Sequence, residues 1–112
     1  MQRNLWDMKT STTHNAQIHI AGPLWLIELA CAKFCQHGFC VSVQASTFVY
    51  TGGQQSGASV GLINYPKFPK TGAEIDAAAL SLAHFLLRET MQKSCSVVTP
   101  SHTYYLENEE LP

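Results

Sequence analysis

The sequence predicts an α+β domain in which two helices pack on one face of a four-stranded antiparallel sheet. Two segments, about 24–37 and 72–91, repeat apolar residues at the spacing of a helix. Two further segments, on either side of a glycine-rich turn, alternate apolar and polar residues as the strands of a hairpin do. With a strand at each end the order is β-α-β-β-α-β, which right-handed crossovers arrange as a ferredoxin-like two-layer sandwich.

The first strand and the first helix are divided by a Gly-Pro pair. Residues 17–21 alternate, with Ile18 and Ile20 on one face. Pro23 ends the strand and is compatible with the first turn of a helix, where its missing backbone N–H is not needed. We therefore expect the helix to follow over residues 24–37.

A long hairpin is expected next in the chain. Residues 39–50 change to a period of two, and residues 58–63 repeat that pattern. The connection carries Gly52, Gly53 and Gly57, which can adopt positive φ and leave their backbone N–H groups open to a ligand. One face of the strands is apolar and the other mostly polar, as in a sheet with helices on a single side.

The second helix has the clearest start signal. Thr71 and Glu74 have the spacing of a capping box, in which each side chain binds the backbone N–H of the other residue. Apolar residues then continue at helical spacing to about Met91. Residues 95–99 predict a strand that a proline ends. Residues 103–106 are expected as an extended tail or as an extra edge strand.

Composition limits the size and the partners of the protein. A chain of 112 residues supports one domain, with a flexible arm expected over residues 1–16, the folded domain over 17–106 and an acidic tail over 107–112. Charged residues make up 13%, which is low against a typical ~25% and favours self-association. A net charge of −1 without a basic cluster argues against binding a nucleic acid polymer.

The sequence carries no signal for a membrane or for export. Its longest apolar stretch, residues 21–34, is short and contains Glu28 and Lys33. Residues 1–16 are polar and lack the apolar centre of a signal peptide. The cysteines are therefore expected to be reduced thiols in the cytoplasm, that of the host cell if a phage encodes the protein.

Both helices carry more apolar surface than one face can bury. Trp25 and Leu29 share an arc with charged residues on the first helix, and Leu80 and Leu87 lie away from the apolar stripe of the second. A helix that is apolar beyond a ~100° stripe buries more than one face. These four residues predict the interface of a homo-oligomer. The alternative is that the N-terminal arm covers Trp25.

Metal-binding and catalytic patterns are weak. Cys31, Cys35 and Cys40 lack a second pair at zinc-site spacing, so buried free thiols are the preferred interpretation and no metal is expected. His19 and His84 are expected on surfaces or interfaces, because neither a G-x-S-x-G elbow nor paired carboxylates accompany them. The sequence predicts no catalytic residue and no cofactor.

The glycine-rich turn and its aromatic neighbours are the best candidate for a binding site. Aromatic faces can stack on a base, and Lys67, Lys70 and Arg88 could neutralise one or two phosphates. As plain hairpin chemistry the turn needs no ligand, and that alternative stays open. The candidate ligand-binding residues are Tyr50, Gly52, Gly53, Gln54, Gln55, Gly57, Asn64, Tyr65, Lys67, Phe68 and Arg88.

The run Phe-Val-Tyr-Thr-Gly-Gly at 48–53, followed by Val-Gly-Leu-Ile-Asn-Tyr-Pro-x-Phe-Pro at 60–69, resembles small uncharacterised proteins of phage and prophage genomes. Small size, low charge and two-faced helices are also similar to phage counter-defence proteins. Among these, the sponges that sequester cyclic nucleotide or cyclic ADP-ribose signals are small oligomeric α/β proteins. The resemblance implies a small nucleotide-like ligand.

Together these features predict a non-enzymatic, homo-oligomeric, phage-type protein that sequesters a small nucleotide-like signal. Two alternatives stay open. The chain could instead bind and inhibit a host defence or replication enzyme through the hairpin edge or a helix face. It could also be a small hydrolase or transferase that uses His19 or His84.

Overall fold

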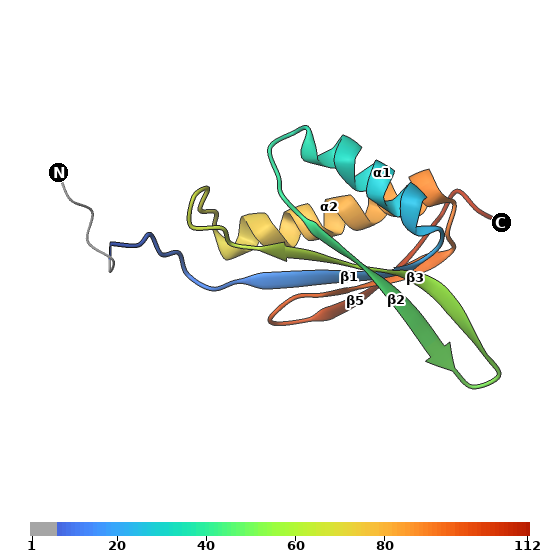
Figure 1. Ribbon diagram of the computed structural model, residues 1–112. Coiled ribbons are helices and arrows are strands. Elements are labelled where there is room, and N and C mark those ends of the chain that lie inside the picture. The colour runs from blue at the N-terminus through green and yellow to red at the C-terminus, as the bar shows by residue number, and fades with distance from the viewer. Residues whose placement is uncertain (1–6) are drawn as a thin grey trace.

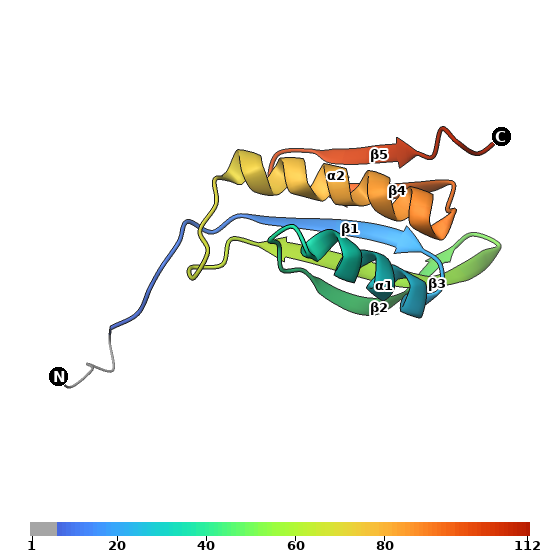
Figure 2. The same cartoon turned by 90° about the horizontal axis from the view of Figure 1, so that it is seen from above.

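Alternation in the central strand sets the two layers of the fold. In β1 (Asn15–Ala21) the buried side chains are Ala16, Ile18 and Ile20, and the residues between them lie on the opposite face. Two helices cover the apolar face and leave the other face of the sheet open (Figures 1 and 2). The computed structural model describes residues 7–112.

The sheet of residues 7–112 has five strands. After β1 the elements are α1 (Leu24–Cys35), β2 (Ser42–Tyr50), β3 (Gly53–Ile63), α2 (Gly72–Thr90), β4 (Ser94–Val98) and β5 (Thr103–Glu107). The strand order is β2-β3-β1-β4-β5, and every neighbouring pair is antiparallel. The central strand β1 therefore pairs with β3 on one side and β4 on the other.

The mixed α+β class agrees with the sequence prediction, but the sheet has five strands where four were expected. The additional strand is β5, which the sequence left as an alternative to an extended tail. Its sequence signal is weak because Leu106 alone in this strand is buried in the core, while its other residues are exposed. β5 packs at the edge of the sheet, where it contacts α2.

The additional strand explains why α2 buries a wide arc of its surface. Leu87, which was expected at an interface between chains, is 1% exposed and belongs to the core of the single chain. Asn108, which follows β5, donates from its side-chain Nδ2 to the Leu87 carbonyl at 2.9 Å. Leu80 is half-buried against the same core. The expected contact of Leu87 with another chain is therefore corrected, because β5 and the segment after it already cover this side of α2.

The outer face of α1 is open in the single chain. Trp25 is 67% exposed and Leu29 is 47% exposed, so residues 7–14 of the arm do not cover Trp25. The arm leaves the sheet at the opposite end from the start of α1 (Figure 2). Residues 1–6 of the expected arm lie outside the described residues. Within residues 7–112, neither helix is long and apolar enough to cross a membrane.

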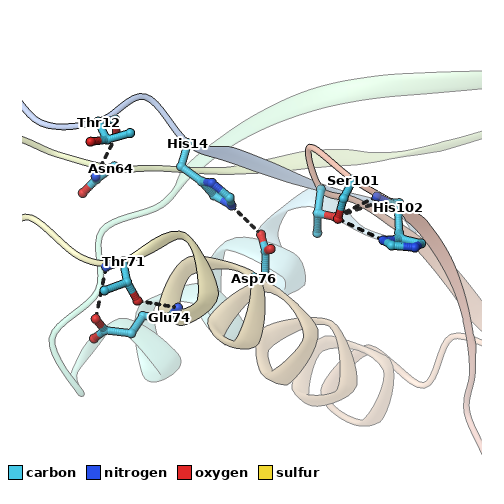
Figure 3. Close-up of polar contacts among 9 residues, drawn as sticks. Thr12, His14, Asn64, Thr71, Glu74, Asp76, Ser101 and His102 are labelled. Carbon is cyan, nitrogen blue, oxygen red and sulfur yellow. Dashed lines mark hydrogen bonds and ion pairs between the residues drawn. The ribbon is translucent and has the colours of Figure 1, made fainter.

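The capping box of α2 is confirmed. The Thr71 hydroxyl oxygen accepts from the Glu74 N–H at 3.1 Å, and Glu74 Oε1 accepts from the Thr71 N–H at 3.1 Å (Figure 3). The helix ends at Met91, which adopts the left-handed conformation with φ 55°. The capping box fixes where the β3–α2 loop meets the helix.

The glycines of the hairpin have different roles from those expected. Gly52, with φ 90°, provides the positive φ of the turn. Gly53 and Gly57 lie inside β3 and have no positive φ, which corrects the expectation. A Cβ at Gly57 would collide with the Ile20 carbonyl oxygen and stand 2.8 Å from the Phe48 ring. Gly57 is thus needed for the close approach of strands and ring, not for a turn.

Candidate functional site

A cavity opens where β3 leaves the sheet. It lies between the loop before β2, the end of β3 and the β3–α2 loop, and its volume is about 380 Å³. Small-molecule sites in proteins have volumes of roughly 300–1,000 Å³. We call it the Tyr65 cavity. Its lining residues are Gly38, Phe39, Cys40, Leu62, Ile63, Tyr65, Phe68, Lys70 and Ile75.

The floor of the Tyr65 cavity is apolar. Leu62 from β3 and Ile75 from α2 are each 2% exposed. Phe39 forms part of the wall and packs against Phe34 of α1, with ring centroids 6.0 Å apart. Charges on a ligand that enters this cavity lose part of their water, so electrostatic interactions there are stronger than at an open surface.

Asn64 holds the loop beside the cavity. Its backbone N–H donates to the His14 carbonyl at 3.1 Å, and its side-chain Nδ2 donates to the Thr12 carbonyl at 2.8 Å (Figure 3). Its Oδ1 accepts from the Lys70 N–H at 2.9 Å, and its carbonyl accepts from the Ser11 hydroxyl at 2.6 Å. Each polar atom of Asn64, which was expected as a ligand contact, is thus already bonded within the chain.

Two lysines cover aromatic rings of the Tyr65 cavity. The Lys70 ammonium lies 4.7 Å from the centroid of the Phe39 ring, and the Lys67 ammonium lies 5.5 Å from that of Phe68. These distances are within the range of cation–π attraction. Neither lysine belongs to an ion pair among residues 7–112. Lys70, which is half-buried, therefore brings a positive charge to an apolar cavity.

Tyr65 and Cys40 line the same cavity. Hydrogen bonding with Cys40 is the largest cause that raises the pKa of Tyr65 above its ordinary value, followed by burial and the electrostatic effect of Cys40. A phenolic hydroxyl such as that of Tyr65 can donate a hydrogen bond to a ligand. Cys40 was expected to be a buried free thiol, and its exposure corrects that expectation.

The four free cysteines differ in access. Cys40 is exposed, Cys35 is half-buried, and Cys31 and Cys95 are buried. Burial raises the pKa of Cys31 to about 12, with smaller contributions from Cys35 and Glu28, and raises the pKa of Cys95 to about 11. The pKa of Cys35 is also raised, mainly by burial. Of the four thiols, Cys40 is the most accessible to a reagent in solution.

The structure separates the sequence-predicted ligand residues into three places. Tyr65, Lys67 and Phe68 lie at the Tyr65 cavity, with Asn64 behind them. Tyr50, Gly52, Gly53, Gln54 and Gln55 are exposed at the hairpin tip, at the opposite end of the sheet (Figure 1). Arg88 lines a third region, a cavity of about 310 Å³ between α2 and residues 107–110, together with His84.

Sequence reasoning therefore joined residues that do not share a site. Tyr65 and Phe68 were predicted as aromatic neighbours of the glycine-rich turn, and Lys67 as a cation for a ligand phosphate. Sequence reasoning missed Phe39 as a ligand residue, because the Phe39–Lys70 contact depends on how the chain before β2 packs against the β3–α2 loop. The positive charge of Lys70, close in the chain to Lys67 and Phe68, was the one sequence signal for this part of the site.

A second polar group lies on the open face of the sheet. His19 Nδ1 is 3.0 Å from the Ser59 hydroxyl, which is itself 3.0 Å from the Ser46 hydroxyl. The His19 ring meets the edge of Phe48 at a centroid distance of 6.2 Å. These side chains face away from the helices and do not line the Tyr65 cavity. Among residues 7–112, no three His, Cys, Asp or Glu side chains are placed to hold a metal ion.

Two solved structures are similar to this one. A phage SAM lyase in the apo state superposes with a TM-score of 0.69 at 15% sequence identity, over 88% of this chain and 92% of that chain. A phage SAM lyase in complex with S-methyl-5′-thioadenosine superposes with a TM-score of 0.62 at 13% identity, over 97% of this chain and all of that chain. No protein-family model and no curated protein sequence matches the chain.

These comparisons correct the function expected from the sequence. Both similar structures are phage proteins, in keeping with the general resemblance to phage proteins, and one holds a small nucleoside ligand. Both are enzymes, however, and this contradicts the expectation of a non-enzymatic sponge. The sequence prediction preferred a non-enzymatic protein because the chain lacks a known catalytic motif. At 13–15% identity the likeness itself shows the fold.

Proposed function

We propose that this protein is a lyase that cleaves SAM and releases S-methyl-5′-thioadenosine. The observation that carries the proposal is the fold shared with phage SAM lyases over 88% and 97% of this chain. The Tyr65 cavity supports it, because a cavity of about 380 Å³ with aromatic walls suits a nucleoside. The shared fold thus supports SAM as the substrate, and the cavity supports this end of the sheet as the place of cleavage.

The proposed reaction removes the positive charge on the SAM sulfur. The bond between sulfur and the γ-carbon of the amino acid chain breaks, and its electron pair stays on sulfur, which becomes a neutral thioether. The γ-carbon then forms a new bond in one of two ways. The substrate's own carboxylate oxygen bonds to it and gives a lactone, or a β-proton leaves to a base and gives an alkene. Neither route consumes water.

The apolar floor of the cavity favours this chemistry. In the lactone route a carboxylate and a sulfonium approach each other and both charges disappear. Water stabilises the separated charges of the substrate more than it stabilises the neutral products. The buried side chains of Leu62 and Ile75 exclude water from one side of the cavity, so the charged substrate gains less solvation there. An intramolecular attack also needs no second reactant to be positioned.

The proposal gives separate roles to the residues of the cavity. The Phe68 ring flanks the nucleoside, Phe39 forms the wall beside the sulfonium, and the Tyr65 hydroxyl donates a hydrogen bond to the nucleoside. Asn64 keeps the loop in place through its four bonds within the chain. Lys67 stands at the rim, over the exposed ring of Phe68.

Incubation of the purified protein with SAM, followed by mass spectrometry of the small molecules, tests the proposal. We expect S-methyl-5′-thioadenosine and a four-carbon fragment in equal amounts, above a control without protein. The mass of the fragment cannot separate the lactone from the alkene acid, since they are isomers, so chromatography against both standards identifies the route. SAM that stays intact at high protein concentration would contradict the proposal.

A further inference from the structure

The cavity contains an aromatic face that already holds a cation. The Lys70 ammonium lies 4.7 Å from the centre of the Phe39 ring, and both residues line the Tyr65 cavity. A ring face attracts any cation that approaches within about 6 Å, whether ammonium or sulfonium. The position that Lys70 occupies is thus one that suits the sulfonium of SAM.

The same ammonium is able to take a carboxylate partner. The ion pairs found among residues 7–112 are His14–Asp76 and Lys33–Glu89, so Lys70 is in neither. Hydrogen bonds with Thr71, whose N–H donates to Glu74 Oε1 at 3.1 Å, are the main cause that lowers the pKa of Glu74, and the charge of Lys70 contributes less. A half-buried ammonium bound only to a ring face gains a charge-assisted hydrogen bond when a ligand brings a carboxylate.

We propose that Lys70 selects the substrate by exchanging partners: its ammonium leaves the Phe39 ring to pair with the substrate carboxylate, and the substrate sulfonium takes its place on that ring. This inference rests on the proposed function, which supplies a substrate that carries both charges. The flexible four-carbon stem of lysine permits the movement. A ligand with a sulfonium but no carboxylate must compete with Lys70 for the ring, so the exchange favours ligands that have both groups.

Binding of three ligands by calorimetry separates the two contacts. S-adenosylhomocysteine has the carboxylate without the sulfonium, decarboxylated SAM has the sulfonium without the carboxylate, and S-methyl-5′-thioadenosine has neither. We expect Lys70→Met to bind S-adenosylhomocysteine about tenfold more weakly, a loss of about 1.4 kcal/mol in binding free energy. The same variant should bind decarboxylated SAM several-fold more tightly, because the Phe39 ring is uncovered. Its affinity for S-methyl-5′-thioadenosine should change less than twofold.

Two further variants control for a structural effect. Lys70→Arg keeps the charge and should retain the binding of S-adenosylhomocysteine within about threefold. Phe39→Leu removes the ring face and should weaken decarboxylated SAM more than S-methyl-5′-thioadenosine. Equal weakening of all three ligands by Lys70→Met would show a merely structural role and overturn the inference. Unchanged binding of decarboxylated SAM by Lys70→Met would also overturn the inference. A wild-type protein that binds none of the three ligands would overturn it as well.

Failure of the proposed function gives a different result. SAM turnover is measured on the same preparations, and a protein that binds these ligands in the expected pattern without cleaving SAM supports the exchange while contradicting the lyase. A protein that cleaves SAM but shows equal effects on all three ligands supports the lyase and overturns the exchange.

Discussion

His14 and Asp76 form an ion pair that ties the segment before β1 to the first turns of α2. His14 Nε2 lies 2.7 Å from Asp76 Oδ1 (Figure 3). The His14 ring also lies against Gly72, where an added Cβ would stand 2.7 Å from the ring. A side chain at Gly72 would push the ring away, so the small residue and the ion pair depend on each other. The pair braces the loop that borders the Tyr65 cavity.

The first prediction concerns this dependence. Gly72→Ala should lower the free energy of unfolding by up to about 0.5 kcal/mol, because the methyl group displaces His14 and breaks a half-buried pair worth about 1 kcal/mol, which outweighs the gain in helix propensity. In a His14→Ala background the same change should raise it by about 0.5–1 kcal/mol, since alanine is the better helix former. Urea denaturation of the four proteins measures the coupling. Stabilisation by Gly72→Ala in both backgrounds would contradict the contact.

The second prediction concerns Tyr65. Tyr65→Phe removes the hydroxyl and keeps the ring, so the rate of S-methyl-5′-thioadenosine formation should fall by about 3- to 10-fold, as for the loss of one hydrogen bond to the substrate. The melting temperature should change by no more than a few degrees, because the ring packing is retained. Tyr50→Phe at the hairpin tip is the matched control and should leave the rate unchanged. An equal loss in both variants would place the site elsewhere.

The third prediction concerns alkaline pH. The folded chain raises the pKa of Cys31 to about 12 and of Cys95 to about 11, from the ordinary value of 9.0. Between the ordinary pKa and the raised pKa of each thiol, the unfolded chain loses its thiol proton while the folded chain keeps it. Rising pH therefore favours unfolding. The stability that these two thiols contribute should therefore be fully present below pH 9. Above pH 9 the free energy of unfolding should fall by up to about 1.4 kcal/mol per pH unit for each thiol.

Replacing both thiols by alanine tests this assignment. The variant starts from a lower stability, because buried atoms are lost, but its decline between pH 8 and pH 10.5 should be shallower than that of the wild type. Lysine and tyrosine titration is common to both proteins and cancels in the difference. Urea denaturation at the two pH values gives the slopes, and parallel slopes would refute the role of the buried thiols.

The fourth prediction concerns self-association through α1. Trp25 and Leu29 expose large apolar side chains on its outer face, and burial of each contributes roughly 1.5–3 kcal/mol. We expect the protein to form a dimer or a larger assembly, and Trp25→Glu with Leu29→Lys should shift it to monomer in light scattering. Leu80→Lys, on the half-buried side of α2, serves as the comparison. A wild-type protein that is monomeric at high concentration would contradict the proposal.

Local signals were predictable from the sequence, and contacts between distant segments were not. Thr71 and Glu74 lie three residues apart, so their capping box could be identified from spacing alone. β5 was ambiguous because a single buried residue, Leu106, distinguishes it from an exposed tail. Its pairing with β4 is a tertiary event that also explains the burial of Leu87.

The candidate site shows the same division. Tyr65, Lys67 and Phe68 are near neighbours in the chain, and the sequence placed all three among the ligand residues. Phe39 and Cys40 reach them only because the loop before β2 folds back against the β3–α2 loop. The glycines at the hairpin tip were grouped with Tyr65 because β3 joins them in the sequence. An extended strand separates its two ends in space, and that distance is absent from a pattern of residue types.

Cys40 allows the central claim, that SAM is cleaved in the Tyr65 cavity, to be tested most directly. It is the exposed one of the four cysteines and lines the cavity beside Tyr65, so N-ethylmaleimide should modify it first. The measurement is the rate of S-methyl-5′-thioadenosine formation against the fraction of Cys40 modified, read by mass spectrometry. We predict that the rate falls in proportion to that fraction, and that excess S-methyl-5′-thioadenosine during labelling protects the thiol. An unchanged rate after complete modification of Cys40 would contradict the account.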